Sequence, residues 1–148
     1  MGSYISAQLR RLVAERADHL CEYCLVHEDD RGFGCQVDHI ISEKHGGSTE
    51  EGNLAYACAP CNRAKGSDIG SIAEHTGSFI PLFNPRIDKW HEHFKVAGPE
   101  IIGLTETGRV TVNILRLNDE PRRLEREVLV TQRRYPTVSA QRRMTADF

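Results

Sequence analysis

Cys21-Glu22-Tyr23-Cys24 and Cys58-Ala59-Pro60-Cys61 are the two segments that decide the fold of this chain, and 33 residues separate them. Two thiolates three residues apart can bind one metal ion, and a second such pair completes the four-coordinate shell that Zn²⁺ prefers. We therefore predict a structural zinc site formed by the four cysteines. Cys35, the fifth cysteine, is predicted to be a buried small apolar residue.

A second group of residues lies between the cysteine pairs or directly after the second pair. It consists of Asp38-His39, Gly46-Gly47 and Asn53, which fall between the pairs, and Asn62, which follows the last cysteine. An imidazole can take a proton from water near neutral pH. A carboxylate from Asp38 and an amide oxygen from Asn62 suit Mg²⁺ or Mn²⁺ better than zinc. These residue types indicate hydrolytic chemistry beside a zinc site.

The local pattern predicts a small hairpin followed by a helix. Residues 36–41 and 53–57 are predicted strands, and a short helix is expected after Cys61 and limited by Gly66. Successive side chains of a strand face opposite ways, so Asp38 and His39 can act together only at the end of a strand or at an irregularity.

The order of these elements, Cys-x-x-Cys, Asp38-His39, Gly-Gly, Asn53-Leu54 and Cys-x-x-Cys-Asn62-x-x-Lys65, resembles the HNH endonuclease family, whose core is the ββα-metal fold. The resemblance covers residues 21–66. It implies that His39 is the general base, that Asp38 and Asn62 bind the catalytic metal, and that Asn53 holds the loop.

Asn62 departs from the histidine that many members have at this position, which places the chain near the HNN variant. We expect it to bind metal more weakly and to favour harder ions. Arg63 and Lys65 follow within a turn and could contact a substrate phosphate, with ordinary surface exposure as the alternative.

The flanking segments predict an α+β protein. Ser6 can cap an N-terminal helix that runs toward Leu20. Residues 101–104 and 109–117 are predicted to form a hairpin around the turn 105–108, or a three-stranded sheet with the segment that contains Trp90, Phe94 and Val96. A last helix from Asn118 or Asp119 to Thr131 is predicted to turn Leu124 and Val128 inward. Residues 1–80 then form the zinc-stabilised core with the N-terminal helix, and residues 81–148 an appended β-hairpin with a basic C-terminal helix and tail.

Other features after residue 80 fit this plan. Trp90 and Phe94 are predicted core residues, and His91 and His93 are predicted surface residues on a strand. The segments 81–86, 90–94, 103–105 and 108–112 resemble the tail of a group of small stand-alone bacterial HNH proteins.

Composition bounds the class of protein. The chain has 148 residues, of which 39% are hydrophobic and 27% charged, as in soluble globular proteins. It contains no apolar run of membrane-spanning length and no signal-peptide pattern, which favours a cytoplasmic protein with reduced thiols. A net charge of −2 gives no overall reason to expect a polyanionic partner.

Basic residues nevertheless gather near the C-terminus. These residues are Arg122, Arg123, Arg126, Arg133, Arg134, Arg142 and Arg143. They predict either a tail that follows the phosphates of a nucleic acid or a solvated helix face with a frayed end.

Taken together, these features predict a zinc-stabilised DNA endonuclease that uses Mg²⁺ or Mn²⁺ and a water deprotonated by His39. Two alternatives stay open: a non-catalytic zinc module that binds nucleic acid or protein, and an RNase whose nucleophile is a substrate 2′-OH. One such site cuts one strand, so a double-strand break would need a homodimer or two visits.

Overall fold

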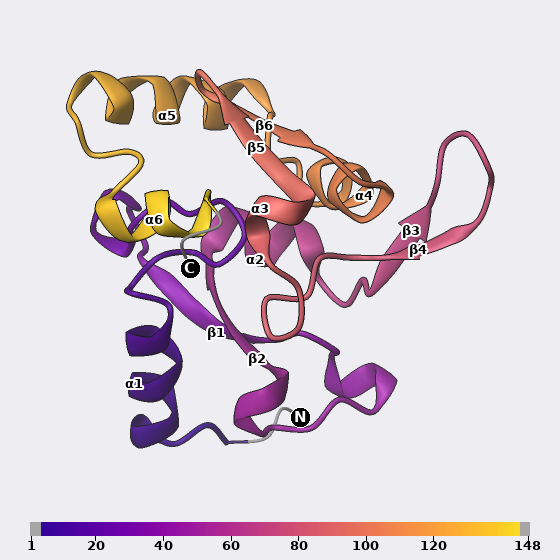
Figure 1. Cartoon of the computed structure of the whole chain (residues 1–148). Helices are drawn as coiled ribbons and strands as arrows, with labels where there is room; N and C mark the ends of the chain where they lie inside the picture. Colours follow the sequence, from indigo (N-terminus) through magenta and orange to yellow (C-terminus); the bar gives the residue numbers. More distant parts are fainter. Residues whose placement is uncertain (1–3, 146–148) are drawn as a thin grey trace.

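A computed structural model describes residues 4–145 of the chain (Figure 1). The first helix, α1, spans Ala7–Arg16, and the side chain of Ser6 accepts a hydrogen bond from the Leu9 backbone at 3.1 Å. The predicted cap is therefore confirmed. The helix ends before Leu20 because Asp18 and His19 both adopt left-handed backbone conformations, with φ of 54° and 60°.

The predicted hairpin and short helix are present. Strand β1 (Cys35–His39) pairs antiparallel with β2 (Leu54–Cys58), and helix α2 (Ala59–Lys65) follows directly. The register pairs Cys35 with Cys58 and His39 with Leu54. Gly66 ends the helix with a φ of 53°. Two strands and a helix in this order form the ββα unit.

The two helices of this region take opposite faces of the β1–β2 hairpin. On one face, Val13 and Ala17 from the α1 segment pack against Leu54 and Tyr56. On the other face, side chains from α2 contact Gln36 and Asp38 of β1: Asn62 reaches the first and Lys65 the second. Alternation along the strand thus directs Gln36 and Asp38 toward α2. Cys35, predicted to be buried, is half-buried and packs against both apolar clusters.

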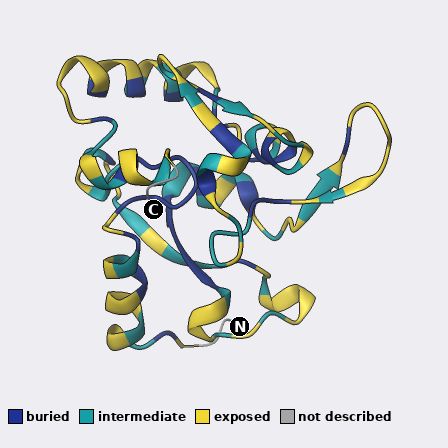
Figure 2. Ribbon diagram, viewed as in Figure 1, coloured by how far each residue is buried: buried dark blue, intermediate teal, exposed yellow. Residues whose placement is uncertain are grey.

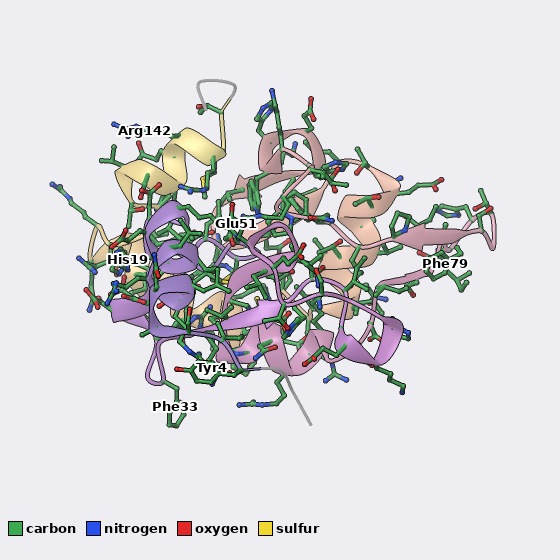
Figure 3. All side chains as sticks on the ribbon, turned by 90° about the horizontal axis from the view of Figure 1, so that it is seen from below. Tyr4, His19, Phe33, Glu51, Phe79 and Arg142 are labelled. Atoms are coloured by element: carbon green, nitrogen blue, oxygen red, sulfur yellow. The ribbon has the colours of Figure 1, made fainter. Side chains whose placement is uncertain are left out.

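A second hairpin, which the sequence did not predict, projects from the body of the molecule. It consists of β3 (Gly70–Ile72) and β4 (Phe79–Pro81). Figures 1 and 2 show it extending to one side with an exposed tip, and Phe79 lies far from the centre in Figure 3.

The predicted hairpin at 101–104 and 109–117 is wrong in position. The short helix α3 (Trp90–His93), which holds His91 and His93 in place of the predicted strand, leads into a hairpin of β5 (Phe94–Ala97) and β6 (Glu100–Gly103). Trp90 and Phe94 are buried, as predicted.

The segment after β6 is helix α4 (Glu106–Ile114). Thr105 caps α4 by accepting a hydrogen bond from Gly108 at 3.0 Å, so the residues predicted as a turn begin a helix. A Cβ on Gly108 would lie 2.0 Å from the His93 carbonyl oxygen, which explains why glycine stands there.

The last helices are α5 (Glu120–Thr131) and α6 (Val138–Arg143). The extent of α5 agrees with the prediction, but its predicted orientation is wrong, since Leu124 and Val128 are each 53% exposed. Arg122 and Arg126 face inward instead and are buried. Arg126 donates to the carbonyl oxygens of Pro99 and Leu117, both at 2.7 Å, because buried carbonyls in this region need donors that leucine could not supply.

The predicted phosphate-tracking tail is accordingly wrong for Arg122 and Arg126, which are internal. Arg134 and Arg143 also pair within the chain, with Asp30 at 3.1 Å and Asp18 at 2.7 Å.

The main apolar cluster is shared by both parts of the chain. It contains the four paired cysteines together with Trp90, Phe94, Leu129 and Tyr135. The segment after residue 80 therefore packs onto the cysteine region. Among residues 4–145, none of the helices has the length and apolar character needed to cross a bilayer.

Candidate functional site

The four paired cysteines come together as predicted. Cys21 and Cys24 lie in the turn after α1, Cys58 ends β2, and Cys61 lies in α2. Their four sulfur atoms are buried and lie within 4.8 Å of one another, with Cys24 and Cys58 at 3.7 Å. Zn–S bonds of about 2.3 Å in a tetrahedron place sulfur atoms about 3.8 Å apart, so the residues fit a zinc ion.

Two arginines donate hydrogen bonds to this cluster. Arg31 Nη2 lies 3.3 Å from the Cys24 sulfur, and Arg122 Nη2 lies 2.9 Å from the Cys61 sulfur. Burial alone would lower the pKa of Arg31 and Arg122, but the nearby thiolates outweigh it and raise both pKa values. A Zn²⁺ ion with four thiolates carries two net negative charges, and the two guanidinium groups balance them.

Neutral contacts also fix the turn between Cys21 and Cys24. The indole nitrogen of Trp90 donates to the Tyr23 carbonyl oxygen at 2.9 Å, and the Tyr135 hydroxyl donates to that of Cys24 at 2.9 Å. Trp90, Tyr135 and Arg122 thus reach the cysteine site from the segment after residue 80, and Arg31 reaches it from between the cysteine pairs.

Asn53 closes the loop between β1 and β2. Its side-chain oxygen accepts from the Ile41 backbone nitrogen at 2.9 Å, and its amide donates to the Ile41 and Ser48 carbonyl oxygens at 2.9 and 2.8 Å. Gly47 lies against the same clasp, because a Cβ there would meet the Ile41 oxygen at 1.7 Å. These three hydrogen bonds agree with the loop-holding role that the family resemblance implies for Asn53.

His39 stands at the end of β1 and is oriented by that loop. Its Nε2 lies 2.9 Å from the Thr49 hydroxyl and 3.9 Å from a carboxylate oxygen of Glu43. Within residues 4–145, we find no hydrogen bond to its Nδ1. If Nε2 carries the proton and donates to Thr49, Nδ1 is left as the nitrogen that can accept a proton from water.

Asp38 precedes His39 and turns toward α2. Its Oδ2 is buried and lies 3.2 Å from the Lys65 ammonium, while 16% of the side chain stays exposed. Burial raises the pKa of Asp38, and the charge of Lys65 opposes that rise. Lys65 was expected either to contact a substrate phosphate or to be exposed on the surface. The second alternative is wrong, because Lys65 is buried and its ammonium faces inward; the phosphate contact remains a prediction.

Asn62 faces the same side of the hairpin as Asp38 but contacts Gln36. Its side-chain nitrogen donates to the Gln36 side-chain oxygen at 3.1 Å. Gln36 and Asp38 are two residues apart on β1, which is about 7 Å along a strand. Asn62 and the exposed Arg63 border a surface hollow of about 300 Å³.

The donors available here fit a hard divalent cation. Asp38 offers its second carboxylate oxygen, and Asn62 offers an amide oxygen that makes no hydrogen bond within the described part of the chain. Mg²⁺ takes one or two protein oxygen ligands and keeps several waters, so two donors on an open surface suffice. The assignment of Asp38, His39, Asn53 and Asn62 as the catalytic set remains a prediction.

Several residues of the site were not foreseen. Thr49 orients His39, Arg31 and Arg122 donate to the thiolates, and Gln36 positions Asn62. The sequence carries no local signal for them, because each acts through a contact that only the folded chain creates. The sequence singled out Arg122 only as one of the basic residues near the C-terminus, and it gave Arg31 no role.

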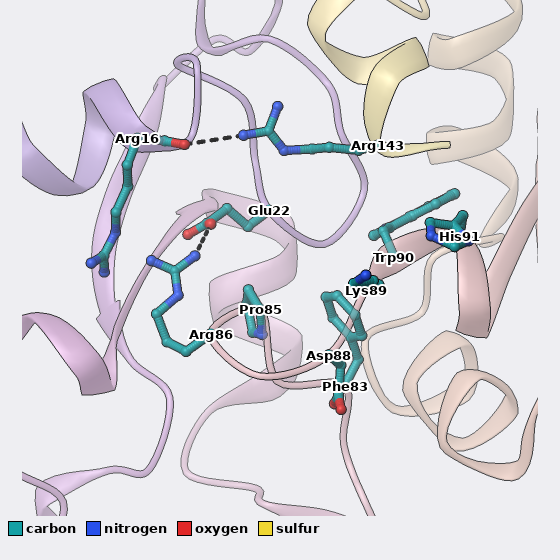
Figure 4. Close-up of a pocket in the computed structure, with 10 residues that line it drawn as sticks. All are labelled: Arg16, Glu22, Phe83, Pro85, Arg86, Asp88, Lys89, Trp90, His91 and Arg143. Atoms are coloured by element: carbon teal, nitrogen blue, oxygen red, sulfur yellow. Dashed lines mark hydrogen bonds and ion pairs between the residues drawn. The ribbon is translucent and has the colours of Figure 1, made fainter. Parts of the chain in front are cut away.

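A larger cavity lies away from these residues. It measures about 530 Å³ and is bounded by α1, the segment 83–91 and α6 (Figure 4). The Glu22 carboxylate there pairs with Arg86 and accepts from the Tyr56 backbone nitrogen at 2.8 Å. Its charged groups therefore hold the outer edge of β2, and the cavity is separate from the catalytic candidates.

Comparison with known proteins agrees with this geometry. Residues 21–68 match the family model of the HNH endonucleases and therefore form an HNH domain. The Septu protein PtuB of Bacillus thuringiensis is 24% identical to this chain over 142 residues, which cover 95% of the chain and 52% of PtuB. The chain thus spans about half the length of that curated relative. No solved structure matches the chain.

Proposed function

We propose that the HNH domain hydrolyses DNA phosphodiester bonds with the help of a divalent cation held by Asp38 and Asn62. The observation that carries the proposal is the arrangement around β1: an imidazole at the strand end, a carboxylate one residue before it, and an amide from α2 that reaches the strand face on which the carboxylate lies. An HNH domain implies nuclease-type chemistry on a nucleic acid. We further propose that the substrate is DNA and that the nucleophile is water.

In this proposal, each residue has a chemical task. His39 accepts a proton from the attacking water at Nδ1, while Thr49 holds its other nitrogen. Asn53 keeps the loop that carries Thr49 in place. A bound Mg²⁺ or Mn²⁺ would neutralise the charge that develops on the phosphate oxygens.

Arg63 is the basic residue best placed to attract the nucleic-acid backbone. Its side chain is exposed and borders the hollow next to Asn62. A guanidinium group can bind a phosphate through two hydrogen bonds. A single site of this kind nicks one strand, and a homodimer would be required for concerted cleavage of both.

The test is nicking of supercoiled plasmid by purified zinc-loaded protein with Mg²⁺ or Mn²⁺. We expect the wild type to nick the plasmid and His39→Ala to lose that activity while it keeps one bound zinc. His45→Ala is the matched control, because His45 is an exposed histidine in the same loop. Equal activity of the wild type and His39→Ala would contradict the proposal.

RNA oligonucleotides with and without a 2′-OH at the cleavage position separate the RNase alternative. Cleavage that requires the 2′-OH would replace the proposed reaction. Binding of DNA without cleavage under any divalent ion would identify a non-catalytic zinc module.

A further inference from the structure

Lys65 is a buried lysine in the last turn of α2, with only 2% of its side chain exposed. A buried ammonium is costly unless charged or polar partners surround it. Its ammonium contacts two consecutive residues: Nζ lies 3.2 Å from Asp38 Oδ2 and 3.0 Å from the His39 carbonyl oxygen. The Lys65 side chain thus contacts both Asp38 and His39, the candidate catalytic pair.

The two contacts restrict different degrees of freedom. The bond to the His39 carbonyl fixes the peptide plane that follows His39, at the point where β1 ends. The ion pair turns Asp38 Oδ2 into the interior, where it is buried. Oδ1 is then the carboxylate oxygen that can reach a cation on the surface.

Lys65 also lies close along the chain to the zinc site. Cys61 occupies the first turn of α2, and Lys65 follows it by four residues, which is about one helical turn or 6 Å along the axis. Side chains at this spacing lie on the same face of a helix. A zinc ion that fixes Cys61 therefore also fixes the position from which Lys65 reaches β1.

We propose that Lys65 is a positioning residue that links the zinc site to Asp38 and His39 and presents the Oδ1 atom of Asp38 to the divalent cation. The inference rests on the proposed function, because it assumes that Asp38 binds that cation. It assigns Lys65 a task distinct from phosphate binding, which the exposed Arg63 on the same helix is better placed to perform.

Binding of Mn²⁺ to zinc-loaded protein, followed by electron paramagnetic resonance without DNA, tests the proposal. Removal of a positive charge beside Asp38 would by itself tighten Mn²⁺ binding. Loss of orientation has the opposite effect, and loss of partners of metal ligands weakens metal affinity by about 10–100-fold. We expect Lys65→Met to bind Mn²⁺ at least about tenfold more weakly and Lys65→Arg to be intermediate.

Arg63→Met is the matched control, since it removes an outward-facing charge from the same helix. It should leave Mn²⁺ affinity unchanged and raise the KM for DNA, whereas Lys65→Met should lower kcat with the KM within about twofold. Asp38→Asn should abolish the Mn²⁺ signal. Native mass spectrometry should show one zinc in every variant.

Mn²⁺ binding by Lys65→Met that equals or exceeds that of the wild type would overturn the inference. If Lys65→Met loses zinc or does not fold, Lys65→Arg decides: intermediate Mn²⁺ affinity supports the inference, and wild-type affinity or loss of folding overturns it. The inference is also overturned if the wild type does not bind Mn²⁺, or if its Mn²⁺ binding is unaffected by Asp38→Asn. A wild type that binds Mn²⁺ at Asp38 but does not cut DNA refutes the proposed function alone.

Discussion

Replacing Arg122 with methionine should weaken zinc retention, although Arg122 is far from the cysteines in sequence. Arg122 Nη2 donates to the Cys61 sulfur at 2.9 Å, and Nη1 donates to the Leu115 carbonyl oxygen at 2.7 Å. Methionine has a similar length but no donors. The variant would leave a buried thiolate with less charge compensation and a buried carbonyl oxygen without this partner.

The size of the effect follows from these contacts. A hydrogen bond to a charged group contributes about 1.5–3 kcal/mol, and 1.4 kcal/mol corresponds to a factor of ten in an equilibrium constant. The lost bond to Cys61 should therefore reduce zinc affinity about 10–100-fold. The free energy of unfolding should fall by about 3 kcal/mol. A domain of this size has a total stability of roughly 5–15 kcal/mol, so the variant should still fold.

Two measurements check this prediction. Competition with a chromogenic chelator reports zinc affinity, and urea unfolding can be followed by the fluorescence of Trp90, the single tryptophan of the chain, which donates to the turn between Cys21 and Cys24. Arg123→Met is the control, because Arg123 is 37% exposed and lies 3.7 Å from Glu100 in a surface ion pair of about 0–1 kcal/mol. Equal zinc affinity in the two variants would show that the Arg122 contact does not stabilise the zinc site.

Two further predictions concern the loop that carries the candidate site. Thr49→Val should lower the kcat of plasmid nicking at least about tenfold, because valine cannot accept the hydrogen bond from His39 Nε2 that fixes the tautomer of the ring. An unchanged kcat would contradict the role of Thr49. Gly47→Ala should lower the free energy of unfolding by about 1–3 kcal/mol, since its Cβ would meet the Ile41 oxygen. Gly52→Ala, with open space around it, should melt like the wild type, and similar melting of both variants would argue against the clasp.

The sequence predicted the central unit well because its signals are local. Cysteine pairs at zinc spacing, alternating strand residues and a glycine at the end of α2 each act within a few positions. The same holds for the helix cap at Ser6. The positions of Asn53, His39 and Asp38 in the family order were informative for the same reason, since a motif fixes a short stretch of backbone.

The segment after residue 80 was harder to predict because its pattern depends on distant partners. Thr105 to Gly108 has the composition of a turn, yet Thr105 caps a helix that packs on β6. Helix α5 exposes Leu124, whereas Arg122 and Arg126 share its buried face with Leu129 and bond to thiolates and carbonyl oxygens. The expectation that Leu124 faces the core fails because the buried thiolates and carbonyl oxygens there require hydrogen-bond donors.

The contact between Arg122 and Cys61 also bears on the order in which the protein matures during synthesis. The two residues are separated by 61 positions, so both cysteine pairs leave the ribosome well before α5 does. A nascent chain that has already captured its metal therefore carries an anionic centre that only Arg31 compensates until translation delivers α5. The half-made protein is accordingly the stage at which oxidants or competing metals can reach the thiolates most easily.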